Sequence, residues 1–302
     1  MASRSNTALK VSQEIFVQNN TASLCLLVNR RARMLRVIDF RSGPSSAKRA
    51  LVLDTARKEG IERVYTLVER DECSAWARMG FAREGNIPGF YKRSDAFVLG
   101  AMVGGADNYE ENEQSGTRPA LTESGDDLET DRAYQAARRA IKDIEALPVL
   151  AAKLSPAKDA DVEAAVAAAV RSGRALSGFE PFGRDVTRAH FQCTARGGLS
   201  LTASVEMQTC FDNAFLELLT APKTEKELAL TSAAVKQICD ELLRREIVGC
   251  FALTPADDPK LSAIFPVHGF RRTGTLRGHI VQGKRRVDAF LWSRKLAQPS
   301  DN

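Results

Sequence analysis

The side chains best suited to bind a metal ion or to act as a nucleophile are scattered along this sequence. Its six cysteines form no CxxC pair and no Cys/His spacing typical of a zinc site, and only three histidines could supplement them. We therefore expect no structural metal and mostly buried, reduced thiols, as in cytosolic proteins. We expect His190 and His268 to be structural.

Charge is unevenly distributed along the chain, although the net charge is only +5. Nine acidic residues and one base lie between positions 107 and 131, whereas eight bases and one acid lie between 268 and 296. A basic surface can attract an anionic cofactor or nucleic acid, and a solvated strand-and-turn surface is the alternative. Nucleic acid is the less favoured partner, because aromatic residues are not interleaved with these bases.

Length and composition favour a globular protein with two domains. The chain has 302 residues, which is long for a single core, and its 44% hydrophobic and 27% charged residues are ordinary for globular proteins. No run approaches the roughly 18 apolar residues of a membrane helix. The polar start of the chain lacks the apolar core of a signal peptide. We expect a cytoplasmic protein with no membrane partner; whether it forms a homodimer is left open.

An internal repeat is visible in the sequence. The segment 79–89 is echoed by the segment 268–278, at a constant offset of 189 residues. The matched positions are Gly80/Gly269, Phe81/Phe270, Gly85/Gly274, Ile87/Leu276 and Gly89/Gly278. A second match, Asp-Ala-Phe at 95–97 and at 288–290, follows after a four-residue insertion in the second copy. Such self-similarity indicates two copies of one structural unit.

The elements around the repeat agree between the two copies. In the first copy, the residue patterns predict strands at 24–28, 34–40 and 61–68 and helices at 46–59 and 70–79. In the second copy, they predict strands at 199–207, 214–220 and 247–253 and helices at 231–245 and 258–267. Each copy closes with an extended segment. The alternation of strand and helix favours parallel pairing and predicts an α/β fold of two tandem units, each a mixed, partly parallel central sheet flanked by helices. Two separate domains and one fused pair both remain open.

A change in composition separates the two units. Residues 105–131 are acidic and rich in small polar residues, so we expect a flexible linker between an N-terminal unit at 8–104 and a C-terminal unit at 132–297. The C-terminal unit begins with additional elements, predicted as a helix at 131–147, a strand at 149–153 and an alanine-rich helix at 158–171. It is therefore the more complete unit and the favoured location of a functional site.

The order of strand, helix, strand, short helix, Gly-Phe dipeptide and hairpin resembles the GNAT superfamily of N-acetyltransferases. A narrower likeness is to the β-lysine N-acetyltransferase family. It is carried by the sequences EGNIPGFY at 84–91, SDAF at 94–97, FEPF at 179–182, FLELLTAP at 215–222, GFRRTGTL at 269–276 and LWSRKL at 291–296. Their order matches over nearly the whole chain apart from the linker. The resemblance implies a GNAT-like fold in both units and an acetyltransferase in the C-terminal one.

The resemblance also implies acetyl-CoA as a co-substrate. GNAT enzymes bind its pyrophosphate with Arg/Gln-x-x-Gly-x-Gly/Ala at a helix N-terminus, where backbone N–H groups grip phosphate and glycine permits close approach. Here that place holds KTEKELALTS at 223–232, with two glutamates and no glycine, so the motif is degenerate. The loop 41–48 of the first copy is closer in character but is not the motif either. The residues then expected to bind the cofactor are Leu218, Leu219, Thr220, Lys223, Lys226, Thr231 and Ser232.

Acetyl transfer requires a deprotonated amine, a polarised thioester carbonyl and a proton for the leaving thiolate. Glu217 is the candidate base or amine-binding carboxylate, and an outward-facing strand position is its alternative. His279 is the candidate acid or acceptor contact, because imidazole titrates near neutrality, and a hairpin-surface position is its alternative. Glu180, Phe182 and Arg277 are the candidate contacts of the acceptor, and a place in the core is the alternative for Phe182. Since RGHIV at 277–281 replaces an Asn-rich run of the family, we expect an acceptor other than β-lysine.

Two functions follow from these observations. The leading hypothesis is an acetyl-CoA-dependent N-acetyltransferase that acts on a small amine or amino acid. The alternative is a catalytically silent GNAT-like protein that serves as an interaction or scaffold module, which the degenerate phosphate loops of both copies favour.

Overall fold

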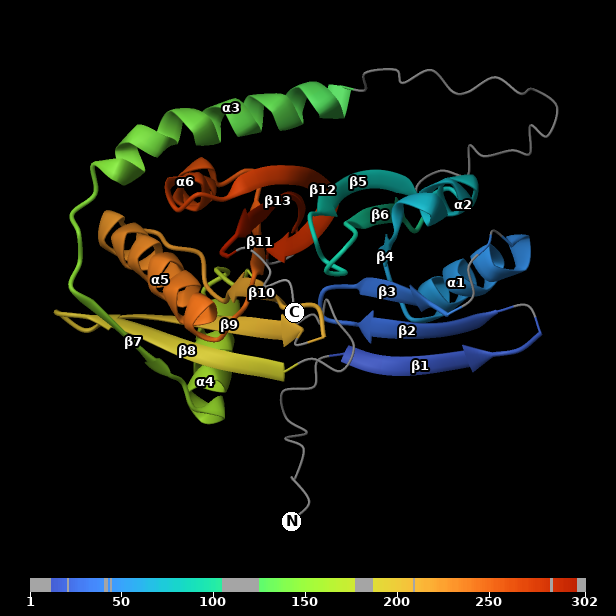
Figure 1. Cartoon of the computed structure of the whole chain (residues 1–302), viewed down its shortest axis with the longest axis horizontal. Coiled ribbons are helices and arrows are strands. Elements are labelled where there is room, and N and C mark those ends of the chain that lie inside the picture. The colour runs from blue at the N-terminus through green and yellow to red at the C-terminus, as the bar shows by residue number, and fades with distance from the viewer. Residues whose placement is uncertain are drawn as a thin grey trace, which may run out of the picture.

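One continuous sheet of thirteen strands runs through the computed structural model of the chain (Figure 1). The structure describes residues 12–20, 22–40, 43, 45–104, 125–176, 187–208, 210–282 and 285–297. The strand order is β1-β2-β3-β4-β6-β5-β12-β13-β11-β10-β9-β8-β7, so the strands of the N-terminal unit form one half of the sheet and those of the C-terminal unit the other. The two units are therefore a fused pair.

The N-terminal unit contains six strands and two α-helices among its described residues. Its elements are β1 (Ser12–Gln18), β2 (Ser23–Asn29), β3 (Met34–Asp39), α1 (Ser46–Lys58), β4 (Arg63–Val68), the short 3-10 helix η2 (Arg70–Glu72), α2 (Cys73–Arg78), β5 (Ala82–Ile87) and β6 (Ala96–Met102). Helix α1 begins where the side chain of Ser45 accepts a hydrogen bond from the backbone N–H of Lys48. It ends before Gly60, whose φ of +65° suits a residue without a side chain.

The C-terminal unit repeats this arrangement after further elements, α3 (Gly125–Glu145), β7 (Ala152–Pro156) and α4 (Asp159–Arg171). The repeated elements are β8 (Thr187–Ala195), β9 (Leu199–Gln208), β10 (Asn213–Leu218), α5 (Glu225–Arg244), β11 (Gly249–Pro255), α6 (Pro259–Val267), β12 (Arg271–Gln282) and β13 (Arg285–Lys295). Helix α3 lies over α6 (Figure 1), and the ring of Tyr134 contacts Phe290 and Trp292 of β13.

The predicted fold class is confirmed: each unit has a mixed sheet flanked by helices. Among the described strands, two pairs of neighbours are parallel, namely β3 with β4 and β10 with β11, and each pair is joined by one helix. The other neighbours are antiparallel, which is a smaller parallel share than the alternation of strand and helix favoured, because β1, β2, β8 and β9 reach their neighbours through hairpins.

The two halves of the sheet meet where the repeat pairs with itself. Strand β5 pairs with the antiparallel β12 at a single position, Gly85 opposite Gly274, and these are equivalent residues of the two copies. The backbones approach so closely that a Cβ atom at either glycine would lie within 3 Å of the other residue's Cα. A local two-fold relation between the units therefore passes through this glycine pair, and neither position tolerates a side chain without movement.

Three large apolar cores, formed by described residues, pack against the sheet. One lies under α3, α5 and α6 of the C-terminal unit, and a second lies under α1 and α2 of the N-terminal unit. The third is built from the opposite sheet face of both units, with Tyr65 and Phe90 from one unit packed with Phe251 and Leu276 from the other. This shared core, together with the continuous sheet, joins the units.

Some boundaries differ from the sequence-based expectation. Helix α3 begins at Gly125, so the last seven residues of the expected linker belong to a helix, and residues 105–124 lie outside the described residues. Helix α5 begins at Glu225, six residues before the predicted start, because Thr224 and Glu227 cap its N-terminus. Strands β1 and β8 were not predicted, since their alternating polar residues resemble loops more than buried strands.

Candidate functional site

The parallel strands β10 and β11 separate within the C-terminal unit. Their register runs from Asn213 opposite Gly249 to Leu216 opposite Ala252, while β10 continues to Leu218 and β11 to Pro255. The predicted base and cofactor-binding backbone, Glu217 to Thr220, therefore lie on the stretch of chain that has left its parallel neighbour. Part of that backbone is already bonded, because the carbonyl of Leu219 accepts a hydrogen bond from the N–H of Leu176 at 3.2 Å.

Glu217 is buried and ion-paired. Its carboxylate lies 3.2 Å from the guanidinium of Arg188 on β8, and only 9% of its side chain is exposed. The same guanidinium lies 3.1 Å from the carboxylate of Glu206 and donates a hydrogen bond to Ser204. One arginine thus bridges two buried carboxylates on neighbouring strands. The side chain of Glu217 is buried, so the alternative of an outward-facing strand position is wrong.

The other unit also reaches this cluster. The guanidinium of Arg31, at the turn after β2, is exposed and lies near enough to the carboxylate of Glu217 for the two charges to interact. Arg31 thus places a positive charge of the N-terminal unit near Glu217. Sequence reasoning missed Arg188, Glu206 and Arg31. The alternation of polar and apolar residues along β8 and β9 could have indicated the first two, whereas nothing local indicates Arg31.

The N-terminus of α5, where the resemblance places the cofactor phosphates, is occupied by a carboxylate of the chain itself. Glu227 accepts hydrogen bonds from the backbone N–H of Lys223 at 2.6 Å and of Thr224 at 3.2 Å. It also accepts one from the guanidinium of Arg174 at 2.9 Å. Burial alone would raise the pKa of Glu227, but these hydrogen bonds hold it below its ordinary value. The backbone N–H groups of Lys223 and Thr224 are thus already bonded to Glu227, and that of Glu227 is bonded to the hydroxyl of Thr224.

The other predicted phosphate contacts are divided between the surface and the helix. Lys223 and Lys226 are exposed at the start of α5. The hydroxyl of Thr231 donates to the carbonyl of Glu227 at 2.7 Å, and that of Ser232 lies 2.8 Å from Nε2 of His268. These two hydroxyls are therefore used within the fold.

The corresponding loop of the N-terminal unit is also internally satisfied. Lys48, in the first turn of α1, forms a buried ion pair with Asp39 at the end of β3. The ammonium group also donates to the carbonyl of Gly43 at 3.0 Å. Both units therefore place an ion pair of their own beside the helix that follows the first parallel strand.

His279 is buried at the junction of the units. The side chain of Arg63 donates a hydrogen bond from Nε to Nδ1 of His279 at 3.2 Å, and the ring of Tyr65 packs against the imidazole edge to face. Burial, followed by the charges of Arg63 and Arg286, holds the pKa of His279 well below its ordinary value. The imidazole is therefore neutral near pH 7 and has no proton to give as an imidazolium acid. Its surface alternative is also wrong.

The structure does not bring the predicted site residues together in one place. His279 and the exposed Arg277 lie on β12, and strands β13 and β11 separate them from Glu217 on β10. Glu180 and Phe182 fall outside the described residues. Within the described ranges, no three His, Cys, Asp or Glu side chains are grouped to hold a metal ion. None of the described helices is long and apolar enough to cross a membrane.

No protein-family model and no curated protein matches this sequence. The solved structures that are similar to it include the ribosomal-protein-S18-alanine N-acetyltransferase from Escherichia coli, with 19% identity, a TM-score of 0.38, and coverage of 50% of this chain and 97% of that one. They also include the spermidine N-acetyltransferase from Vibrio cholerae in complex with CoA and spermine, with 12% identity, a TM-score of 0.40, and coverage of 48% of this chain and 95% of that one.

Proposed function

We propose that the C-terminal unit is an acetyl-CoA-dependent N-acetyltransferase that acts on a small amine or amino acid. The observation that carries the proposal is the separation of β10 from β11 beyond Leu216, with the buried carboxylate of Glu217 on the separated stretch. Backbone groups that are not paired with a parallel neighbour can bind the extended pantetheine arm of acetyl-CoA by strand-like hydrogen bonds. A carboxylate beside that chain can bind or deprotonate an amine.

Each residue then has a defined part in the reaction. Glu217 would hold the acceptor amine and take its proton, which requires Arg188 to yield part of its ion pair. Backbone N–H groups between Leu218 and Thr220 would polarise the thioester carbonyl. With acetyl-CoA bound, the amine would attack the carbonyl carbon and the carbon–sulfur bond would break. Glu217 would hold the proton of the amine, and the leaving thiolate would take a proton from solvent. His279 has no part in this step, because it is neutral, buried and separated from Glu217 by two strands.

A second candidate function, a catalytically silent interaction module, is favoured by Glu227. Its carboxylate accepts the N–H groups of Lys223 and Thr224, which a pyrophosphate would otherwise accept. A phosphate arriving there would have to displace Glu227 from Arg174 and would meet repulsion until it did so. This arrangement is expected in a protein that has kept the fold but no longer binds acetyl-CoA.

One experiment separates the two functions. The melting temperature of the full chain is measured with and without acetyl-CoA, and CoA release is followed over a panel of diamines and amino acids. A ligand at a hundredfold excess over its Kd adds about 2.7 kcal/mol to the free energy of unfolding. An enzyme should show this stabilisation and an amine-dependent release of CoA that Glu217→Gln abolishes while stabilisation by acetyl-CoA remains.

Two variants test whether Glu227 blocks the cofactor. In Glu227→Gln the backbone donors lose a charged acceptor, so acetyl-CoA should bind at least about tenfold more tightly if the phosphates use this helix N-terminus. Glu225→Gln removes the same charge from an exposed residue in the same first turn of α5, two positions before Glu227, and is the matched control. If acetyl-CoA stabilises neither the wild type nor Glu227→Gln, and neither protein releases CoA, the acetyltransferase proposal is refuted. The catalytically silent interaction module is then the function supported.

A further inference from the structure

The internal repeat allows the two units to be compared position by position. The parallel registers begin with Met34 in β3 and Asn213 in β10, and each contains four pairs, so the two strands correspond from their first residues. Cys25 lies opposite both Phe16 and Ile38, just as Ser204 lies opposite both His190 and Glu217.

These registers make two aromatic residues of the N-terminal unit equivalent to covered residues of the C-terminal unit. Phe16 corresponds to His190 on β8. Phe40 stands two positions after Ile38, and so corresponds to Leu219, which stands two positions after Glu217.

In the C-terminal unit, helix α4 crosses the sheet face between these two positions. Before the helix, the N–H of Ala157 donates to the carbonyl of His190 at 2.8 Å. After the helix, the N–H of Leu176 donates to the carbonyl of Leu219. Between these contacts, Val162 of α4 packs on Leu219, with Val166 beside them, and the side chains of Val162 and Leu219 are almost completely buried.

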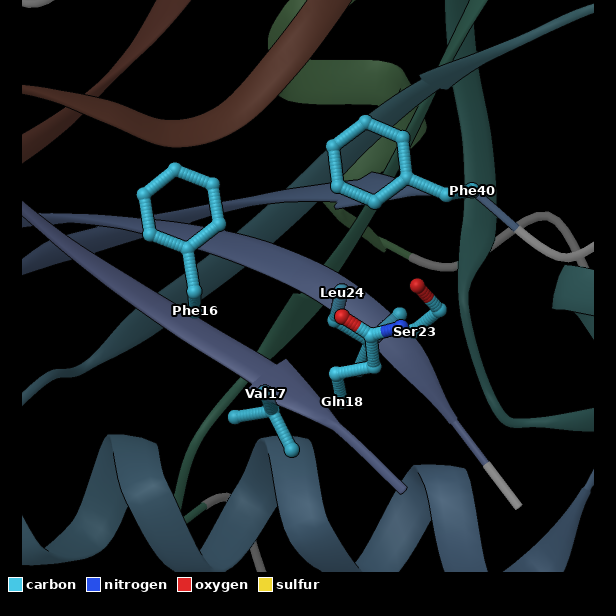
Figure 2. Close-up of a pocket in the computed structure, with 6 residues that line it drawn as sticks. All are labelled: Phe16, Val17, Gln18, Ser23, Leu24 and Phe40. Atoms are coloured by element: carbon cyan, nitrogen blue, oxygen red, sulfur yellow. The ribbon is translucent and has the colours of Figure 1, made fainter. Parts of the chain in front are cut away.

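In the N-terminal unit the same face is open to solvent. No counterpart of β7 or α4 occurs among its described residues. Phe16 is 57% exposed and Phe40 is 49% exposed, which are high values for phenylalanine. Figure 2 shows both rings on the sheet face that turns away from helix α1, whereas Val17 points towards that helix.

The open face is hollowed and mainly apolar. A shallow pocket there is lined by Phe16, Gln18, Ser23 and Phe40 (Figure 2). Val17 and Leu24 also line it, although their side chains pack in the core under α1. Aromatic rings flanked by a few polar groups are typical of surfaces that bind a partner. The aromatic Phe16 replaces the polar His190 of the covered face, so this surface is better suited to an apolar ligand than its counterpart.

We propose that this face of the N-terminal unit, centred on Phe16 and Phe40, is a docking site for an amphipathic α-helix of a partner protein. The helix would carry small aliphatic residues four positions apart, as α4 does with Val162 and Val166. The equivalent face within the same chain shows the geometry of that occupant, a helix of about three turns whose flanking residues bond to β8 at one end and to the chain after β10 at the other. This interaction goes beyond the proposed catalytic function and involves the other unit.

The probe for the test is a peptide of residues 157–173, which contains α4. Short helices are marginal in water, so a hydrocarbon staple between positions 163 and 167, both exposed in α4, should hold the peptide helical. Binding of the fluorescently labelled peptide to the full chain is measured by anisotropy. A control peptide carries Val162→Asp and Val166→Asp, which removes the apolar stripe and keeps the staple.

The peptide should bind the wild-type chain saturably, and Phe40→Asp should weaken that binding at least about tenfold, because buried aromatic anchors dominate such interfaces. Leu243→Asp places the same charge at an exposed apolar residue of α5 and should leave binding unchanged. Circular dichroism melts check that both variants fold.

Several results would overturn the proposal. One is the absence of saturable binding at millimolar peptide, and another is binding that Phe40→Asp leaves intact. Sedimentation that shows a dimer of the wild type, lost in Phe40→Asp, would assign the face to a second copy of the chain. Peptide binding that appears only after deletion of residues 1–11 would assign it to the chain's own N-terminal segment.

Discussion

Alanine at Gly274 should destabilise the protein at the junction of its two units. A Cβ atom at this position would lie 2.5 Å from the Cα of Gly85 and 2.6 Å from the carbonyl oxygen of Glu84. Both atoms belong to the backbone of β5, so no side-chain rotation can relieve the overlap. One of the two strands must move, and each is held in the sheet by its hairpin partner.

The expected cost follows from these contacts. Overpacking a close-packed site costs typically about 1–3 kcal/mol, and two backbone overlaps well under 3 Å place Gly274→Ala at the upper end. Replacing glycine by alanine also reduces the conformational entropy of the unfolded chain, which stabilises the folded state by about 0.4–1 kcal/mol. The free energy of unfolding should therefore fall by about 2 kcal/mol in total. Gly85→Ala should cost less, about 1 kcal/mol, because only one of its contacts is under 3 Å and the next is 3.1 Å.

Gly249 provides a matched control. It also lies in a strand of the sheet, but a Cβ there would meet only the Cβ of Asn213, at an ordinary 3.7 Å. Gly249→Ala should therefore change the free energy of unfolding by no more than about 0.5 kcal/mol.

The two tryptophans allow both units to be followed in one urea titration. Trp76 lies in α2 of the N-terminal unit and Trp292 in β13 of the C-terminal unit, and both are buried. In single-tryptophan backgrounds, Trp76→Phe and Trp292→Phe, the two probes should report one common transition, because the sheet and the third core are shared. Gly274→Ala should lower both midpoints together.

Two outcomes would refute the reasoning about the junction. If Gly274→Ala were as stable as Gly249→Ala, the close approach of β5 and β12 would not exist in solution. If only one tryptophan reported a lowered midpoint, the units would unfold independently, and the glycine contact would not couple them.

Three further predictions concern buried polar groups. Burial first, and neighbouring arginines second, hold the pKa of His279 well below its ordinary value. Between the two pKa values, the imidazole is therefore protonated in the unfolded chain and neutral in the folded chain. The free energy of unfolding should therefore fall by up to about 1.4 kcal/mol per pH unit below about pH 6.5, and His279→Asn should flatten this slope in urea titrations at pH 5, 6 and 7; an unchanged slope would contradict the assignment. Lys48→Met removes the buried cation that pairs with the carboxylate of Asp39 and should cost about 3–5 kcal/mol by urea unfolding, whereas Arg57→Met, in an exposed pair, should cost less than about 1 kcal/mol. Asn213→Leu removes the hydrogen bond to the buried carbonyl of Phe90 in the other unit and should lower stability by about 1–3 kcal/mol; a stability equal to the wild type would show that this bond between the units is absent.

The sequence by itself determined the repeated unit and most of its elements. Helix α1 and strand β4 could be read from local periodicity, because side-chain spacing on one helix or strand depends on neighbours within a few residues. The matched glycines at 85 and 274 were visible as equivalent positions, and both lie where the repeat predicted a common structural role.

The tertiary structure alone decided how the units meet and what the candidate site contains. That Gly85 faces Gly274 depends on strands nearly two hundred residues apart, and no local pattern encodes such a pairing. The sequence marked Glu217 as a carboxylate in an apolar strand, but its ion pair with Arg188 and its approach to Arg31 arise only when three distant segments converge. Burial likewise turned His279 from a candidate acid into a neutral side chain, because desolvation is a property of the folded surroundings and not of the residue.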